Sequence, residues 1–306
     1  MTKILLKYIP YAIVMRCYYY WYRFQKRSFN KQLKKEGYRI LNQIDLSQYK
    51  KSDKLFVIGS GYSLNSITKN QWDEINRNDK FGFNFSFLNK DHIPTFYSCE
   101  AVKRDNPNEF GRSEMGELFY NLYKSRKDQY SKVIKIIGDI EENRKQHFEN
   151  YGRDFFDDNL FIINTVNGVG STESQMIKLI ETLRKKKVFN VKKYLDEVFK
   201  FRATVSMAIS FGVNLGYKEI ILCGIDLSDP RYFFEDREKY PSLPEFYFTN
   251  KSKIHLTLQK DEVFAPIDIV VKVLKSHVCD QKGIRLSVQN PNSALAQHLP
   301  VYQFEN

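Results

Sequence analysis

Cysteine is scarce in this sequence, and its four copies lie far apart. Cys17, Cys99, Cys223 and Cys279 form no CxxC pair. This pattern argues against a zinc site or a disulfide framework, and it indicates free thiols in a reducing compartment. Cys223 stands within an apolar run, where we expect it to be a small core residue. The sequence therefore predicts a cytoplasmic protein without a structural metal.

Long hydrophobic runs are also missing. A span across a bilayer needs about 20 apolar residues, whereas the apolar stretch at residues 3–16 is interrupted by Lys7, Pro10 and Arg16. No small-residue cleavage site comes after that stretch. We therefore expect neither a membrane-spanning helix nor a cleaved signal peptide here.

The next segment of the chain is aromatic and basic. Residues 18–22 read YYYWY, and six cations come next: Arg23, Lys26, Arg27, Lys31, Lys34 and Lys35. Interfacial aromatics beside cations are typical of a helix that lies on anionic headgroups. The alternative is an ordinary helix that packs its aromatic side chains on the domain. We expect residues 1–50 to form a basic helical arm, with residues 1–35 on an anionic membrane surface at the inner face of the cell membrane.

Acidic residues are fewer than basic residues in this sequence. The 306 residues include 48 Lys and Arg against 36 Asp and Glu, a formal charge of +12. Such a charge favours polyanionic partners without choosing among them. Apart from residues 23–35 and 184–193 the basic residues are dispersed, and no RNA-binding signature is present, so we expect no nucleic acid partner. A non-catalytic basic module that binds nucleotides or nucleic acid remains an alternative.

The hydrophobic pattern predicts one α/β domain over residues 51–306. Short apolar runs predict strands, and longer amphipathic stretches between them predict helices, which together indicate a doubly wound parallel sheet, a modified Rossmann-like fold. The expected strands are 54–58, 80–84, 95–99, 133–137, 160–163, 219–224 and 283–288; the expected helices include 106–130, 176–201, 204–215 and 263–277. The Pro- and aromatic-rich residues 229–262 have no helical period, and we expect them to form a small lid.

Four features stand where ligands bind in such sheets, outside the carboxyl ends of strands. The turn Gly59-Ser60-Gly61 fits a phosphate cradle or a tight structural turn; without a third glycine or an acidic residue after the second strand, it does not indicate a nicotinamide cofactor. Asn84 fits recognition of a base or sugar hydroxyl, or the satisfaction of its own turn. Asp226 fits a functional role or a cap. His255 fits a general base or an ordinary hydrogen-bonded histidine.

The order of these motifs resembles family 42 of the glycosyltransferases, the bacterial sialyltransferases. The resemblance rests on residues 57–64 (VIGSGYSL), the strand that carries Asn84, residues 202–226 with GYKEIILCGID at their end, the lone His255 and residues 291–293 (PNS). It covers roughly residues 54–300, and residues 100–200 match least. It implies a modified Rossmann fold, a GT-A-like variant.

The same resemblance implies a reaction and a set of roles. Such enzymes transfer an acidic sugar from a CMP-sugar, with inversion and without a metal or other cofactor, to a hydroxyl group of an acceptor glycan. His255 would be the general base, and Tyr232 would stabilise the departing phosphate. The nucleotide would be held by Gly59, Ser60, Gly61 and Asn84, and Pro291, Asn292 and Ser293 would approach the cytidine. Thr204 and Ser206 would lie near the sugar carboxylate, and Arg202, Asp226 and Ser228 would also bind the CMP-sugar.

Two departures from the family pattern surround the donor sugar. Ser228 stands where a second tyrosine is expected, so Tyr240 or Tyr247 would replace it, and Ala203-Thr204-Val205-Ser206 replaces a Ser-Gly pair after Arg202. These departures predict sialic acid or a related donor such as pseudaminic acid, legionaminic acid or Kdo. The expected acceptor is a surface glycan or glycolipid such as lipooligosaccharide or capsule, with a protein hydroxyl as the alternative and a homo-oligomer as a further expectation.

Overall fold

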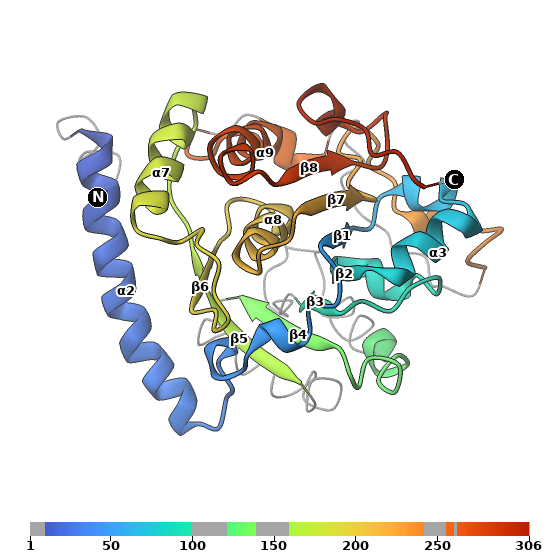
Figure 1. The fold of residues 1–306 in the computed structure, drawn as a ribbon, viewed down its shortest axis with the longest axis horizontal. Helices are drawn as coiled ribbons and strands as arrows, with labels where there is room; N and C mark the ends of the chain where they lie inside the picture. The colour runs from blue at the N-terminus through green and yellow to red at the C-terminus, as the bar shows by residue number, and fades with distance from the viewer. Residues whose placement is uncertain (1–9, 100–120, 139–158, 242–254, 260–261, 306) are drawn as a thin grey trace.

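The computed structural model describes residues 10–99, 121–138, 159–241, 255–259 and 262–305. Its centre is a sheet in the order β6-β5-β4-β3-β2-β1-β7-β8, in which every neighbouring pair is parallel (Figure 1). The strands are β1 Lys54–Ile58, β2 Asp79–Phe83, β3 Phe96–Cys99, β4 Ile134–Gly138, β5 Leu160–Val166, β6 Glu197–Phe199, β7 Glu219–Cys223 and β8 Arg285–Val288. The predicted parallel α/β fold is confirmed.

Helices cover both faces of this sheet. The α-helices are α2 Tyr11–Lys35, α3 Lys69–Arg77, α7 Glu173–Lys185, α8 Thr204–Asn214 and α9 Ile267–Leu274. Short 3-10 turns include η3 Tyr62–Ser66, η4 Asn84–Leu88, η5 Phe233–Glu235, η6 Leu256–Leu258 and η9 Ala294–Gln297. Gly216 comes after α8 with a φ of +71°, a left-handed conformation that is common where helices end.

Side chains of β1 alternate between the two faces of the sheet, and both faces are buried under other elements. Leu55 and Val57 belong to a core that also contains residues of α7, α8 and α9. Phe56 and Ile58, on the opposite face, belong to a second core that contains residues of α3 and η4. All four side chains are fully buried, as expected for a parallel strand with both faces covered.

The expected helix over residues 176–201 is wrong in its second half. The helix α7 ends at Lys185, and Lys187 has a left-handed backbone with a φ of +62°. The chain then returns to the sheet as β6, where Val198 pairs with Thr165 of β5. Pairing and burial of Val198 and Phe199 override the helical preference of the basic residues around them. Of the expected helix 106–130, residues 106–120 lie outside the described part.

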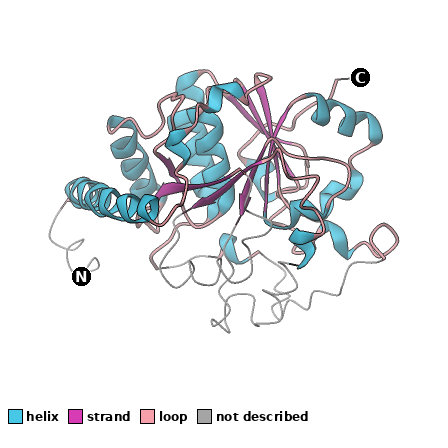
Figure 2. Cartoon of the chain, turned by 90° about the horizontal axis from the view of Figure 1, so that it is seen from below, coloured by secondary structure: helices cyan, strands magenta, loops and turns pink. Residues whose placement is uncertain are grey.

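The N-terminal arm is a helix that packs on the domain. Met15, Tyr19 and Tyr22 of α2 are buried in the first core, and the Tyr19 hydroxyl donates to Glu197 at 2.7 Å. Figures 1 and 2 show α2 along one end of the molecule, beside α7. No helix in the described ranges has the length and apolar character needed to cross a bilayer. The arm is therefore part of the folded domain on one of its faces.

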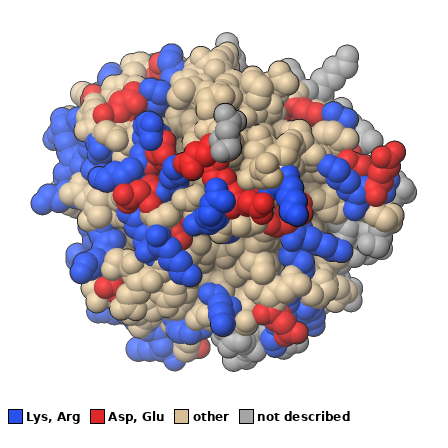
Figure 3. All heavy atoms as spheres, turned by 45° about the vertical axis from the view of Figure 1, so that its right-hand side comes forward, with Lys and Arg blue, Asp and Glu red and all other residues tan. Residues whose placement is uncertain are grey.

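The charged side chains do not separate by sign on the face drawn in Figure 3. There, Asp and Glu side chains lie among the more numerous Lys and Arg side chains. A continuous basic surface, which nucleic acid binding requires, is not formed on that face.

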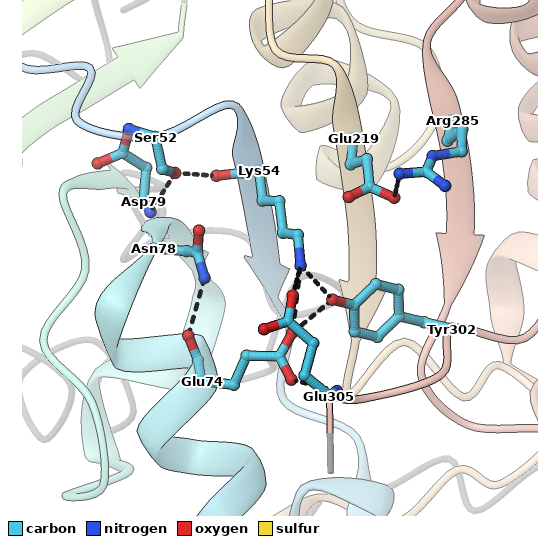
Figure 4. Close-up of polar contacts among 9 residues, drawn as sticks. All are labelled: Ser52, Lys54, Glu74, Asn78, Asp79, Glu219, Arg285, Tyr302 and Glu305. Atoms are coloured by element: carbon cyan, nitrogen blue, oxygen red, sulfur yellow. Dashed lines mark hydrogen bonds and ion pairs between the residues drawn. The ribbon is translucent and has the colours of Figure 1, made fainter.

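A polar cluster closes the amino end of β1 (Figure 4). The Lys54 ammonium lies 2.6 Å from Glu305, 3.0 Å from the Tyr302 hydroxyl and 3.5 Å from Glu74. Glu74 is 2% exposed and also accepts hydrogen bonds from the Tyr302 hydroxyl and from the backbone N–H of Glu305. The cluster fastens the C-terminal residues to β1 and α3.

We expect Glu74→Gln to destabilise the fold by about 1–3 kcal/mol, because the buried cluster loses its charge and one acceptor. The urea midpoint at equilibrium measures this change. Glu305→Gln is the matched control, since its side chain is 67% exposed and such a pair contributes little. Equal midpoints for the two variants would show that the cluster has no such role.

Candidate functional site

Several residues singled out from the sequence stand near the switch point of the sheet. From β1 the chain builds β2 to β6 on one side, and it later returns to add β7 and β8 on the other side. The carboxyl ends of β1 and β7 are therefore neighbours from which the chain departs in opposite directions (Figure 1). Open α/β sheets bind ligands in the crevice at this point.

The glycine turn after β1 presses against the loop after β7. The Gly59 N–H donates to the Cys223 carbonyl at 2.8 Å, and the Gly61 N–H donates to the Gly224 carbonyl at 2.7 Å. A Cβ at Gly59 would lie 2.4 Å from the Gly224 oxygen, and a Cβ at Gly61 would lie 2.4 Å from a carboxylate oxygen of Asp226. Both glycines are thus required for this close approach, which favours the structural-turn interpretation of their sequence.

Asp226 joins three segments at the switch point. Its carboxylate accepts a hydrogen bond from the Ser63 N–H at 2.9 Å and another from the Asn290 side-chain amide at 2.7 Å. Its backbone carbonyl accepts from the Ala294 N–H at 2.9 Å. Because Asp226 is 3% exposed, its role in this structure is to hold the loops in place. Sequence reasoning missed Asn290, although it stands only two residues beyond the end of β8.

The loop after β8 packs against the loop after β7. The Ser293 hydroxyl donates to the Ile225 carbonyl at 2.7 Å, and the Ser228 hydroxyl donates to the Asn292 carbonyl at 2.7 Å. Pro291 and Asn292 are exposed, whereas Ser293 is buried. The structure therefore brings the predicted residues 226, 228 and 291–293 together.

Asn84 stands at the carboxyl end of β2, next to the glycine turn. The following N–H, that of Phe85, donates to the Ser60 hydroxyl at 3.1 Å, which ties the two strand ends together. Asn84 has a φ of +51°, a conformation that asparagine tolerates better than most residues, and its carbonyl accepts from the Tyr97 hydroxyl. The amide side chain is half-buried and makes no hydrogen bond with the described residues.

Tyr232 packs beside the glycine turn. It forms a β-bridge with Gly61, and its ring lies edge-on to Phe85 with 5.6 Å between centroids. Burial, with the nearby charge of Glu235, raises the pKa of the Tyr232 hydroxyl to about 12. The hydroxyl therefore keeps its proton at neutral pH and can donate to an anion.

Of the two tyrosines expected to replace the residue at Ser228, the structure describes Tyr240. Tyr240 packs on Phe233, with 5.1 Å between ring centroids, and it lines a cavity of about 460 Å³ together with Trp72 and Asp91. Tyr247 lies outside the described residues.

His255 lies against the loop after β7. Its backbone N–H donates to the Leu227 carbonyl at 3.4 Å, one residue after Asp226. Its Nδ1 lies 2.8 Å from the Thr257 hydroxyl and 3.3 Å from the Thr257 backbone nitrogen. Burial lowers the pKa of the imidazole below its ordinary value of 6.5, so the ring is neutral at pH 7. In the tautomer whose Nδ1–H donates to the Thr257 hydroxyl, the Nε2 of this neutral, half-buried ring can accept a proton.

Arg202 holds the segment that carries His255. Its guanidinium donates to the Leu256 carbonyl at 3.0 Å, the Phe264 carbonyl at 3.0 Å and the Ala265 carbonyl at 3.2 Å. The backbone of Arg202 has a φ of +61°. This arrangement gives the arginine a positioning role that the sequence did not reveal.

The two hydroxyl residues after Arg202 belong to the first turns of α8. The Ser206 hydroxyl is fully buried; it accepts from the Phe201 N–H at 2.8 Å and donates to the Ala203 carbonyl at 2.7 Å. It therefore stabilises the sharp turn at Arg202. Thr204 begins α8 and is 5% exposed.

Metal ligands do not gather anywhere in the described ranges: no three His, Cys, Asp or Glu side chains there could hold an ion together.

Comparisons with known proteins give two similar structures. No family model matches the chain, and no curated protein matches it. A solved structure of a sialyltransferase CST-II variant in complex with CMP is 16% identical, with a TM-score of 0.41 over 83% of this chain and 89% of that chain. A second CST-II structure, with a trisaccharide acceptor and CMP, is 17% identical, with a TM-score of 0.40 over 82% of this chain and 89% of that chain. Both structures are of a sialyltransferase.

Proposed function

We propose that this protein is an inverting glycosyltransferase that moves an acidic sugar from a CMP-sugar to a hydroxyl group of an acceptor. The observation that carries the proposal is the place of His255, whose backbone is hydrogen bonded to Leu227 in the loop after β7. That loop also contacts the turn after β1 and the loop after β8. A candidate base beside this loop supports the proposal, because sheets of this kind bind nucleotides at the switch point.

The chemistry needs one base and one stabiliser of negative charge. In the proposed reaction, neutral His255 takes the proton of the acceptor hydroxyl while the oxygen forms its bond to the anomeric carbon. The bond from that carbon to the phosphate oxygen breaks, and CMP leaves with the electron pair. Tyr232, protonated at neutral pH, donates a hydrogen bond to the departing phosphate, which a low-dielectric site makes effective without a metal.

The remaining predicted residues fall into three groups in this proposal. Asn84 and the exposed residues Pro291 and Asn292 contact the cytidylate, while Thr204 lies toward the sugar carboxylate. The glycine turn, Asp226, Ser228 and Ser293 shape the crevice through the backbone contacts described above. Arg202 positions the segment that carries His255, and Ser206 stabilises the turn at Arg202.

We place the reaction in the cytoplasm, at the inner face of the membrane, with lipooligosaccharide or capsule as the acceptor. Cys223 and Cys279 are buried free thiols and Cys17 is an exposed one, which agrees with a reducing compartment.

A hydrolysis screen tests the donor. The purified protein is incubated with CMP-sialic acid, CMP-Kdo, CMP-pseudaminic acid and CMP-legionaminic acid, and free CMP is measured. We expect one donor to be hydrolysed in preference to the others. Release of CMP from none of them, with and without acceptor glycans, would contradict the proposal.

The Arg202→Lys variant tests the positioning role. A lysine keeps the charge but cannot reach three carbonyl groups with a planar fork, so we expect kcat to fall roughly 10- to 100-fold through misplacement of His255, with the KM for the donor nearly unchanged. Arg285→Lys is the matched control, because Arg285 is 77% exposed and pairs with Glu219 at the opposite end of the sheet. An unchanged kcat in Arg202→Lys would refute the role.

The pH dependence of kcat/KM tests the state of His255. A lowered pKa means that the neutral, proton-accepting ring persists as the pH falls, and that activity is lost only when the pH passes below that lowered value. The midpoint of the acid limb should therefore lie below 6.5, the ordinary value for this group. A midpoint above 6.5 would exclude the buried imidazole as the base.

A further inference from the structure

The helix α2 exposes large apolar side chains on the side opposite to its buried face. Ile13, Tyr20, Trp21 and Phe24 are 49%, 60%, 55% and 76% exposed. With the exposed Cys17, positions 13, 17, 20 and 24 recur at spacings of four, three and four, which places them in one stripe along the helix. Met15, Tyr19 and Tyr22 are fixed in the core, so the stripe is held outward.

Exposed cations lie beside this stripe and beyond it on α2, and no acidic residue is near it in sequence. The first 35 residues contain no Asp or Glu. Arg16, Arg27, Lys31, Lys34 and Lys35 are all exposed on α2, and most of them lie beyond the apolar stripe toward the C-terminal end of the helix.

The end of α7 adds to the same surface. Lys186, just beyond α7, lies over the Tyr20 ring with 4.3 Å from its ammonium to the centroid, and it also donates to the Tyr20 hydroxyl. Arg184 and Lys185, in the last turn of α7, and Lys187 surround it in sequence. The basic residues of the two segments therefore meet at an exposed aromatic side chain.

We propose that the outer face of α2, joined by Lys186, binds the surface of an anionic lipid bilayer. In this arrangement the helix lies in the plane of the interface, Trp21, Phe24 and Ile13 enter the headgroup region, and the cations contact lipid phosphates. Aromatic and aliphatic side chains bordered by Lys and Arg are what such binding needs. A second copy of the chain would bring an equally basic face toward this one, which like charges disfavour.

The proposal does not rest on the transferase activity, and the way α2 packs determines how it must be tested. Deletion of residues 1–35 would uncover the core that Met15, Tyr19 and Tyr22 help to close. Loss of vesicle binding after such a deletion would therefore not distinguish a lost binding surface from a disrupted fold. Substitution of exposed side chains leaves the fold intact.

Flotation with lipid vesicles is the experiment. The full chain is mixed with phosphatidylcholine vesicles with or without phosphatidylglycerol, at low and high salt. We expect binding only to the anionic vesicles, weaker at high salt, and a loss of about tenfold or more in affinity for Trp21→Ala/Phe24→Ala and for Arg27→Glu/Lys31→Glu. The matched controls are Tyr194→Ala, 54% exposed outside α2, and Lys282→Glu, also exposed; both should bind like the wild type.

Three results would overturn the proposal. The first is no binding to anionic vesicles, or equal binding by the wild type and both α2 variants. The second is a dimer in light scattering that both α2 variants convert to a monomer, which would assign the surface to a second copy. The third is tighter binding of a single-stranded oligonucleotide than of anionic vesicles by the same face.

Discussion

The His255→Ala variant is expected to release CMP about 10²- to 10⁴-fold more slowly than the wild type, which is the usual contribution of a positioned general base. Its affinity for CMP should change little. The substitution keeps the backbone N–H that binds Leu227, and Arg202 still holds the segment through the Leu256 carbonyl. The measurement is the rate of CMP release with saturating donor and acceptor, beside a calorimetric titration with CMP.

His277→Gln is the control for this prediction. His277 lies in the turn after α9, where its ring is 3.8 Å from Glu181, and it has no contact with the crevice in the structure. It should turn over like the wild type. Equal rates for His255→Ala and the wild type would remove the imidazole from the mechanism.

The second large effect is expected for Gly59→Ala. A Cβ at this position would lie 2.4 Å from the backbone oxygen of Gly224, so β1 and β7 would have to separate at their carboxyl ends. We expect a loss of stability of about 1–3 kcal/mol or more, as for other overpacked cores. The urea midpoint measures the loss, and a weaker affinity for CMP should accompany it because the crevice is displaced.

Gly170→Ala provides the comparison. There the nearest atom to a new Cβ is the Tyr11 side-chain hydroxyl oxygen at 3.1 Å, and a side chain adjusts more easily than a strand. If Gly59→Ala were as stable as Gly170→Ala, the close approach of the two loops would not be a requirement of the fold.

The central strands could be predicted because both faces of a parallel sheet are covered. Residues 54–58 and 219–223 read as continuous apolar runs for that reason, and the structure places them side by side. The short strand β6 could not be predicted in the same way. Its identity depends on pairing with β5, a contact that the basic residues around it do not encode locally.

The candidate site was predictable to the extent that it consists of strand ends. Gly59, Asn84 and Asp226 each stand at or just beyond the end of an apolar run, and the architecture brings such positions to one edge. The partners of Asp226 and Arg202 were not predictable. The contact of Asp226 with Asn290 joins residues 64 positions apart, and the carbonyl groups bound by Arg202 come from a segment without a regular pattern.

For the N-terminal arm the sequence left two alternatives, packing on the domain and binding to a membrane. Each of them corresponds to one face of α2. Tyr19 and Tyr22 pack on the domain, as an ordinary helix would. Trp21 and Phe24, one and two residues away from Tyr22, are exposed. Only the helical period separates the two sets, because neighbouring residues point to different sides of a helix.

The place at which CMP binds tests the account most directly. A structure of this protein with bound CMP should contain the nucleotide at the carboxyl ends of β1 and β7, between Asn84 and the loop of Pro291 and Asn292, with the His255 ring across the sugar site from its phosphate. CMP bound at another edge of the molecule, or with the imidazole turned away from it, would contradict the proposed transferase.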